Sequence, residues 1–76
     1  MTKVIYSLNH RFIVQRLREA RKERGMTQKE VAAILERTQS YVAKIESGQR
    51  RIDVVQLLQL ARIYRKPLNY FLRQNV

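Results

Sequence analysis

Cysteine and tryptophan are absent from this chain, and glycine, proline and histidine are scarce, with two glycines, one proline and one histidine. A chain without cysteine forms neither disulfides nor thiolate metal sites, which fits a reducing compartment. Catalysis needs a nucleophile or a pair of acid and base groups, and a single histidine and a single aspartate offer few candidates. We therefore expect no enzymatic activity, no metal, no cofactor and no small-molecule ligand.

Long apolar runs are missing as well. No stretch approaches the roughly 18 apolar residues of a membrane-spanning helix, and the start of the chain lacks the apolar core of a signal peptide. The 76 residues and 45% hydrophobic content suit one small domain with an ordinary core. Because no repeat or linker interrupts the chain, residues 1–76 are expected to form a single domain in the cytoplasm.

Positive charge is in large excess. Sixteen lysines and arginines against six acidic residues give a formal net charge of +10 at pH 7. A small protein with this charge is expected to bind a polyanion. Single-stranded RNA is recognised through exposed aromatic platforms, whereas the aromatic residues here fall mainly at core-like positions, with Tyr41 and Tyr70 as exceptions. Double-stranded DNA is therefore the favoured partner, and a membrane is not expected.

Residues 27–48 have the pattern of two short helices joined by a tight turn. Thr27 and Glu30 form a capping box, which satisfies backbone N–H groups where the first helix begins. Thr38 is a suitable N-cap for the second helix, and Gly48 is free to take the left-handed conformation that ends it. This arrangement predicts a helix-turn-helix whose second helix spans about residues 39–47.

The second helix has two different faces. At about 100° per residue, its apolar side contains Tyr41, Val42 and Ile45. The opposite side contains small, polar and basic residues, namely Gln39, Ser40, Ala43, Lys44 and Ser47. Amide, hydroxyl and ammonium groups can bind base edges, and a methyl group can contact thymine. A solvated helix surface has the same composition, so this face alone does not decide between the two interpretations.

The stretches RLREARKERGMTQKEVA and QSYVAKIESGQRR resemble the DNA-binding domain of the Cro and lambda-repressor family of Xre-like regulators. The similarity extends from about Phe12 to Leu72. It implies an all-α, compact five-helix domain whose third helix enters the major groove of double-stranded DNA. It further implies a transcriptional regulator, often a repressor, that binds a palindromic site as a homodimer on the nucleoid.

The resemblance also implies roles for individual residues. The expected base-reading residues are Gln39, Ser40, Ala43 and Lys44, and Gln28 and Arg37 are expected to contact phosphates. The basic segment after Gly48 places Arg50 and Arg51 where they suit phosphate contacts beside the groove, although a solvated basic loop would fit the pattern too. Arg21 and Glu46 occupy positions that commonly form an ion pair between the first and third helices, although two ordinary surface charges would fit the pattern too. The dimer contacts are expected in the last helix, at Asn69, Tyr70 and Arg73.

Two features depart from the family or leave alternatives open. The family commonly has a glycine and then an apolar residue in the turn, where this chain has Glu36 and Arg37. A non-glycine residue at positive φ costs about 1 kcal/mol. We therefore expect either an altered turn or one more residue at the end of the helix that begins after Thr27. Residues 1–8 fit a frayed end, an arm on DNA through Lys3, a short strand or a dimer contact.

One alternative function is a helical interaction module, such as an antitoxin-like partner of another protein that keeps the fold. A protein-binding groove on the third helix would be apolar. The polar residues Gln39, Ser40 and Lys44 therefore favour DNA as the partner.

Overall fold

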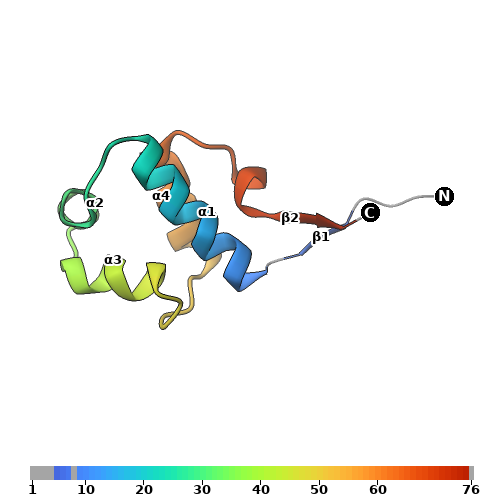
Figure 1. Cartoon of the computed structure of the whole chain (residues 1–76), viewed down its shortest axis with the longest axis horizontal. Helices are drawn as coiled ribbons and strands as arrows, with labels where there is room; N and C mark the ends of the chain where they lie inside the picture. Colours follow the sequence, from blue (N-terminus) through green and yellow to red (C-terminus); the bar gives the residue numbers. More distant parts are fainter. Residues whose placement is uncertain (1–4, 8, 76) are drawn as a thin grey trace.

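The structure, a computed structural model, describes residues 5–7 and 9–75. Its elements are β1 (Ile5–Ser7), α1 (His10–Glu23), α2 (Gln28–Leu35), α3 (Gln39–Glu46), α4 (Val54–Tyr64), the 3-10 helix η1 (Leu68–Phe71) and β2 (Arg73–Asn75). The helices gather into one bundle, from which the two strands project as a ribbon (Figure 1). The all-α fold class is confirmed, with a short 3-10 helix in the place of the fifth helix.

Each α-helix begins at a residue whose side chain accepts a hydrogen bond from a backbone N–H in the first turn. These N-caps are Asn9, Thr27, Thr38 and Asp53. Thr27 and Asp53 belong to full capping boxes, in which Glu30 and Gln56 accept from the backbone N–H of the cap residue. Such caps each stabilise a helix by about 1 kcal/mol. The helix starts therefore follow directly from the local sequence.

The helix ends show how the unusual turn is accommodated. Glu36 ends α2 in the left-handed conformation, with φ 55° and ψ 43°. The sequence left open a longer α2 or an altered turn, and the structure instead places this non-glycine residue at positive φ. Arg65 ends α4 in the same way, with φ 56°. The turn between α2 and α3 therefore keeps its compact form, and Glu36 carries the backbone strain.

A single hydrophobic core joins all the helices. Its buried residues are Ile13, Leu17, Ala20, Val31, Ala32, Val42, Ile45, Leu57, Leu60, Ala61, Tyr64 and Phe71. Tyr64 and Phe71 are the largest side chains that are fully buried. Phe71 closes the core from η1, and the neighbouring Leu72 is half-buried.

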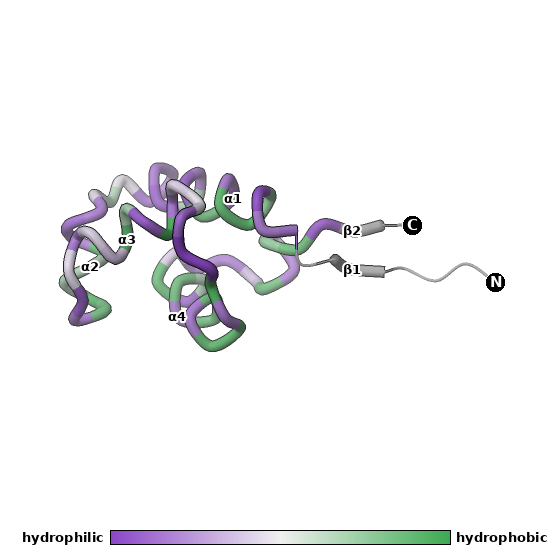
Figure 2. Tube along the Cα trace, turned by 90° about the horizontal axis from the view of Figure 1, so that it is seen from below, coloured by the Kyte–Doolittle hydropathy of each residue, from purple (hydrophilic) through white to green (hydrophobic). Residues whose placement is uncertain are grey.

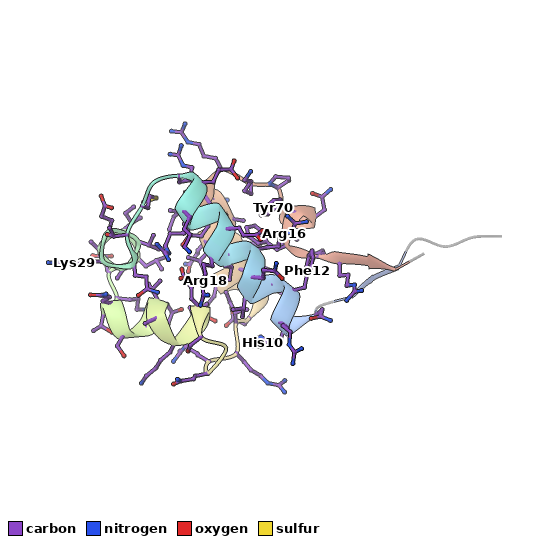
Figure 3. The ribbon with its side chains drawn as sticks, viewed as in Figure 1. His10, Phe12, Arg16, Arg18, Lys29 and Tyr70 are labelled. Carbon is purple, nitrogen blue, oxygen red and sulfur yellow. The ribbon has the colours of Figure 1, made fainter. Side chains whose placement is uncertain are left out.

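Aromatic and basic side chains fix η1 against α1. The guanidinium carbon of Arg16 lies 5.0 Å from the Phe12 ring centroid and 4.7 Å from the Tyr70 ring centroid. Figure 3 shows Arg16 on α1 beside both rings. The Tyr70 ring also meets Phe71 edge-on, at 5.0 Å between centroids. These contacts hold the last helical turn at the end of the domain opposite α2.

The two strands pair antiparallel, with Ile5 opposite Asn75 and Ser7 opposite Arg73. Of the alternatives for residues 1–8, a short strand is therefore observed at Ile5–Ser7. The proposed DNA contact of Lys3 lies outside the described residues. No helix in the described part of the chain is both long and apolar enough to cross a membrane.

Candidate nucleic-acid interface

The face of α3 that was predicted to read bases is exposed. Val42 and Ile45 are buried in the core, while Gln39, Ser40 and Lys44 stand in solvent on the opposite side. Ala43 is half-buried between the two faces. In Figure 1, α3 lies along one edge of the bundle with its outer side uncovered. The structure thus brings the four base-reading candidates together on one accessible helix.

Glu46 fixes the C-terminal end of α3 to α1. Among the residues whose side chains the structure describes, 9–73, it is the one charged residue that is buried, with 3% of its surface exposed. Arg21 donates from Nε to Oε2 at 2.7 Å and from its second terminal nitrogen to Oε1 at 3.0 Å. This hydrogen bonding raises the pKa of Arg21. The structure therefore contains the ion pair implied by the family resemblance, in bidentate geometry.

Two further side chains donate hydrogen bonds to Glu46 and, with Arg21, form what we call the Glu46 anchor. Arg18 donates to the backbone carbonyl of Glu46 at 3.0 Å, and Gln28 donates from Nε2 to Oε1 of Glu46 at 3.1 Å. Figure 3 shows Arg18 reaching from α1 toward α3. No role was predicted for Arg18 from the sequence. Its spacing of three residues from Arg21 was a usable signal, because residues three apart share a helix face.

Gln28 was predicted to contact a DNA phosphate, and its side chain is held toward α3. An amide carries two N–H groups, and the bond to Glu46 uses one of them. The phosphate contact of Gln28 stays a prediction.

Tyr64 of α4 is buried, and the charges of both Arg21 and Glu46 act on its phenol. Burial raises the pKa of Tyr64, the negative charge of Glu46 raises it further, and Arg21 acts in the opposite direction. In such surroundings, removing one partner of an ion pair leaves the other charge uncompensated. Loss of any side-chain donor to the Glu46 carboxylate would therefore leave part of this buried charge without a partner.

Tyr41 brings together two of the predicted phosphate contacts. The guanidinium carbon of Arg37 lies 4.9 Å from the Tyr41 ring centroid, and that of Arg50 lies 4.7 Å from it. Both distances fall within the range of cation–π attraction. From the sequence, Tyr41 was expected on the apolar side of the helix. The spacing of four residues from Arg37 could have indicated one contact, but nothing local indicates that Arg50 returns to the same ring.

The loop that carries Arg50 and Arg51 is held to the end of α3. The backbone N–H groups of Gln49 and Arg50 donate to the carbonyl of Lys44, at 3.0 and 3.2 Å. Nε2 of His10, the single histidine, lies 3.3 Å from the carbonyl oxygen of Gly48. Arg50 and Arg51 are exposed. The backbone of Arg50 is thus held at the C-terminal end of α3, with the exposed Arg51 next to it in the chain.

The residues predicted as dimer contacts lie elsewhere. Asn69 and Tyr70 belong to η1 and Arg73 begins β2. Figure 1 places both elements at the other end of the bundle from α2 and α3. The Tyr70 ring is contacted within its own chain by Arg16 and by Nζ of Lys66, each 4.7 Å from the ring centroid. Their role as dimer contacts stays a prediction.

Metal ligands are not gathered anywhere in the described part of the chain, since no three His, Asp or Glu side chains there could hold an ion together.

The comparisons with known proteins address the family directly. A family model of helix-turn-helix domains matches residues 17–71, most of the chain. The chain belongs to this helix-turn-helix family. The matched residues include all of α2, α3 and α4. The resemblance to Xre-like and Cro-like regulators is thereby confirmed. No curated protein sequence matches the chain.

Three solved structures share the fold. The restriction-modification controller protein C.AhdI from Aeromonas hydrophila is 32% identical, with a TM-score of 0.73 over 82% of this chain and 94% of that one. The DNA-binding domain of BldD from S. venezulae is 25% identical, with a TM-score of 0.74 over 88% and 100%. An HTH_3 family transcriptional regulator from Vibrio cholerae is 21% identical, with a TM-score of 0.72 over 82% of this chain and 35% of that one.

The third likeness shows the fold alone, and this chain spans about a third of that regulator. The family match and the first two neighbours support more than the fold. Together they show that this chain is a DNA-binding transcriptional regulator.

Proposed function

We propose that this regulator is sequence-specific, and that it reads the major groove of double-stranded DNA with α3 as a homodimer on a palindromic site. The observation that carries the proposal is the exposed polar face of α3 on a helix whose opposite side is anchored through Glu46. An α-helix fits the major groove, and base edges there present a distinct pattern for each base pair. A helix held in place, with the polar side chains of Gln39, Ser40 and Lys44 exposed to solvent, suits the recognition of base edges.

Each base-reading residue has a chemical role in this proposal. The amide of Gln39 pairs bidentately with adenine, and the ammonium group of Lys44 donates to guanine. Ser40 reaches a base or a phosphate, and the methyl group of Ala43 contacts a thymine methyl. The residues assigned to phosphates set the register of the protein on the duplex. They are Gln28, Arg37, Arg50 and Arg51.

A homodimer on a palindrome follows from the size of the reading element. α3 has eight residues and covers only a few base pairs. A two-fold dimer doubles the recognised site, with half-sites about one helical turn apart. Such a protein acts on the nucleoid in the cytoplasm. Asn69, Tyr70 and Arg73 are one candidate for the dimer contact.

The test begins with selection of bound sequences from random duplexes, which gives both the preferred site and the half-site spacing. On that site, Gln39→Ala or Lys44→Ala is expected to cost about 1–3 kcal/mol of binding free energy. The same substitutions should cost much less on random DNA, because phosphate contacts carry no sequence information. Equal losses on both duplexes would show that the residue contacts the backbone and would refute its base-reading role.

The matched control is Lys22→Ala, which removes an exposed lysine from α1. It should not change the ratio of preferred to random binding. The thermal stability of all three variants should stay close to that of the wild type, since Gln39 and Lys44 point away from the core.

The alternative function, a protein-interaction module or antitoxin-like partner, predicts a different result. In that case no DNA sequence would be enriched in the selection. Substitutions on the exposed face of α3 would then leave binding to the partner protein unchanged.

A further inference from the structure

His10, the first residue of α1, contacts the loop that follows α3. Its Nε2 lies 3.3 Å from the carbonyl oxygen of Gly48, and because a carbonyl only accepts, the ring is the donor. A Cβ atom built at Gly48 would lie 3.9 Å from the same nitrogen. Figure 3 places His10 on the side of the bundle where this loop runs. An imidazole from α1 therefore packs directly on the segment that leaves α3.

This loop carries the arginines that are proposed to contact phosphates. Gly48 directly precedes Gln49 and Arg50, and Arg51 lines a hollow of about 380 Å³ together with His10. Figure 2 views the molecule from the side on which the loop lies, and shows a strongly hydrophilic segment connecting α3 to α4. The contact at Gly48 therefore acts on the backbone from which Arg50 and Arg51 extend.

Protonation of the ring changes this contact. Histidine is the side chain whose charge ordinarily changes between about pH 5 and about pH 8. A neutral imidazole carries one N–H, on either nitrogen, whereas the imidazolium carries both. The protonated ring of His10 therefore always presents an N–H to Gly48, and a charge-assisted hydrogen bond is stronger than a neutral one. Protonation thus strengthens the attachment of the loop to α1.

The charged groups around the ring come from α1 and from the segment before α4. α1 contributes Arg11, and the segment contributes Arg51 and Asp53. The α4 residues that line the hollow are apolar, and the acidic group of α3, Glu46, is paired with Arg21. Positive charge is thus in local excess. A DNA phosphate brought to Arg51 would offset that excess and favour the protonated ring.

We propose that His10 is a positioning residue for the loop of Arg50 and Arg51, and that binding of duplex DNA is coupled to uptake of a proton by its ring. The inference rests on the proposed function, in which these arginines contact phosphates. Linked binding equilibria are reciprocal, so if the duplex favours protonation, protonation favours the duplex. Affinity should therefore rise as the pH falls. The gain should be complete below the pH at which the ring titrates in the free chain, and lost above the pH at which it titrates in the complex.

The first test is the affinity of the full chain for a random duplex, measured by fluorescence anisotropy at constant ionic strength. From about pH 8 to about pH 5, the wild-type dissociation constant should fall about three- to tenfold, the effect of one charge near the surface. His10→Gln keeps an amide N–H donor that does not titrate. It should bind like the wild type at the alkaline end and show no gain at the acid end. His10→Ala lacks the donor as well, so it should bind more weakly throughout.

Lys22→Ala is the control, because it removes an exposed charge from the same helix and should keep the wild-type pH profile. The α-amino group also titrates in this range, but it is common to every variant. The difference between the wild type and His10→Gln therefore assigns the pH dependence to the imidazole. A merely structural role of His10 would not produce this difference.

The second test needs no variant. Since the chain has one histidine, the ring C–H signals of His10 can be assigned without ambiguity in a nuclear magnetic resonance titration. The midpoint of that titration should lie at a higher pH in the complex with a duplex than in the free chain.

Two outcomes would overturn the inference: the same pH profile for the wild type and His10→Gln, or the same titration midpoint in the free and bound chain. Either result is compatible with a chain that still reads its preferred site through Gln39 and Lys44. Failure here is therefore distinct from failure of the proposed function, which the variants of those two residues test at a single pH.

Discussion

Glu46 connects α3 to α1 and α2 through hydrogen bonds from three side chains. Its carboxylate accepts from Arg21 and Gln28, and its carbonyl accepts from Arg18. The Arg21 partner was implied by resemblance, because the spacing of 25 residues carries no local signal. The contacts of Arg18 and Gln28 were missed, since a sequence shows which face a residue occupies but not how far its side chain reaches.

Thermal stability should report the coupling between Arg21 and Glu46. In a cycle of Arg21→Met, Glu46→Gln and the double variant, we expect a coupling energy of about 1–3 kcal/mol, because each single change leaves the other buried group without its partner. The matched control is the cycle of Glu23→Gln and Lys66→Met. That pair, 3.0 Å apart, includes a Glu23 side chain that is 61% exposed, so its coupling should be close to zero. A zero coupling for Arg21 and Glu46 would rule out a stabilising pair.

Tyr41 is the residue whose role the sequence left unrecognised, and it allows a second experiment. Because Arg37 and Arg50 both contact its ring, Tyr41→Leu should release both guanidinium groups. Each contact contributes about 0.5–1 kcal/mol at an exposed site, so affinity for preferred and random duplexes should fall alike, by several-fold. Tyr41→Phe keeps an aromatic face and should keep most of the affinity. If Tyr41→Leu binds as tightly as the wild type, the ring does not position these arginines.

At the scale of elements, the helix starts were predictable and the chain ends were not. The caps Thr27, Thr38 and Asp53 act on backbone groups a few residues away, so local sequence is sufficient to identify them. The ribbon pairs Ile5 with Asn75, and no local pattern specifies a contact between residues so far apart. The three residues of β2 also lack the β-branched and aromatic side chains that favour strands.

The helix ends offer a direct test of backbone strain. Arg65 has φ 56° at the end of α4, a conformation that glycine adopts without a steric penalty. Arg65→Gly is therefore expected to raise the free energy of unfolding by about 1 kcal/mol, which corresponds to an increase of about 4–8 °C in melting temperature for a domain of this size. Arg65→Ala keeps the strained conformation with a Cβ atom and should give no such gain. A glycine variant that melts at or below the wild-type temperature would contradict the strain argument.

At the scale of the whole molecule, the net charge follows directly from the sequence, but the positions of the charged side chains on the surface do not. The excess of lysine and arginine was enough to predict a polyanionic partner. Only the fold shows that Arg37 and Arg50 meet at one ring, and that Glu36 and Arg62 line the same hollow between α2 and α4. The polar face of α3 could be predicted because a single short helix contains it. The hollow lies between two helices that are separated along the chain, so only the structure shows it.

The salt dependence of DNA binding measures how much of that charge contacts the duplex. Each phosphate neutralised releases counterions, so log K should fall by about 0.9 per phosphate for each tenfold increase in salt concentration. Arg50 and Arg51 are exposed on a loop held to the end of α3. Replacing either by alanine should weaken binding to all sequences alike and reduce the slope by about one unit.

Arg65→Ala is the control for this measurement. It removes the same charge from the end of α4, so nonspecific loss of positive charge would affect it equally. If Arg50 and Arg51 contact phosphates, their variants should lower the slope while the Arg65 variant leaves it unchanged. A uniform small decrease in all three variants would instead mean that the protein is attracted by its net charge without a defined contact surface. A slope near zero in the wild type would remove the electrostatic basis for duplex binding altogether.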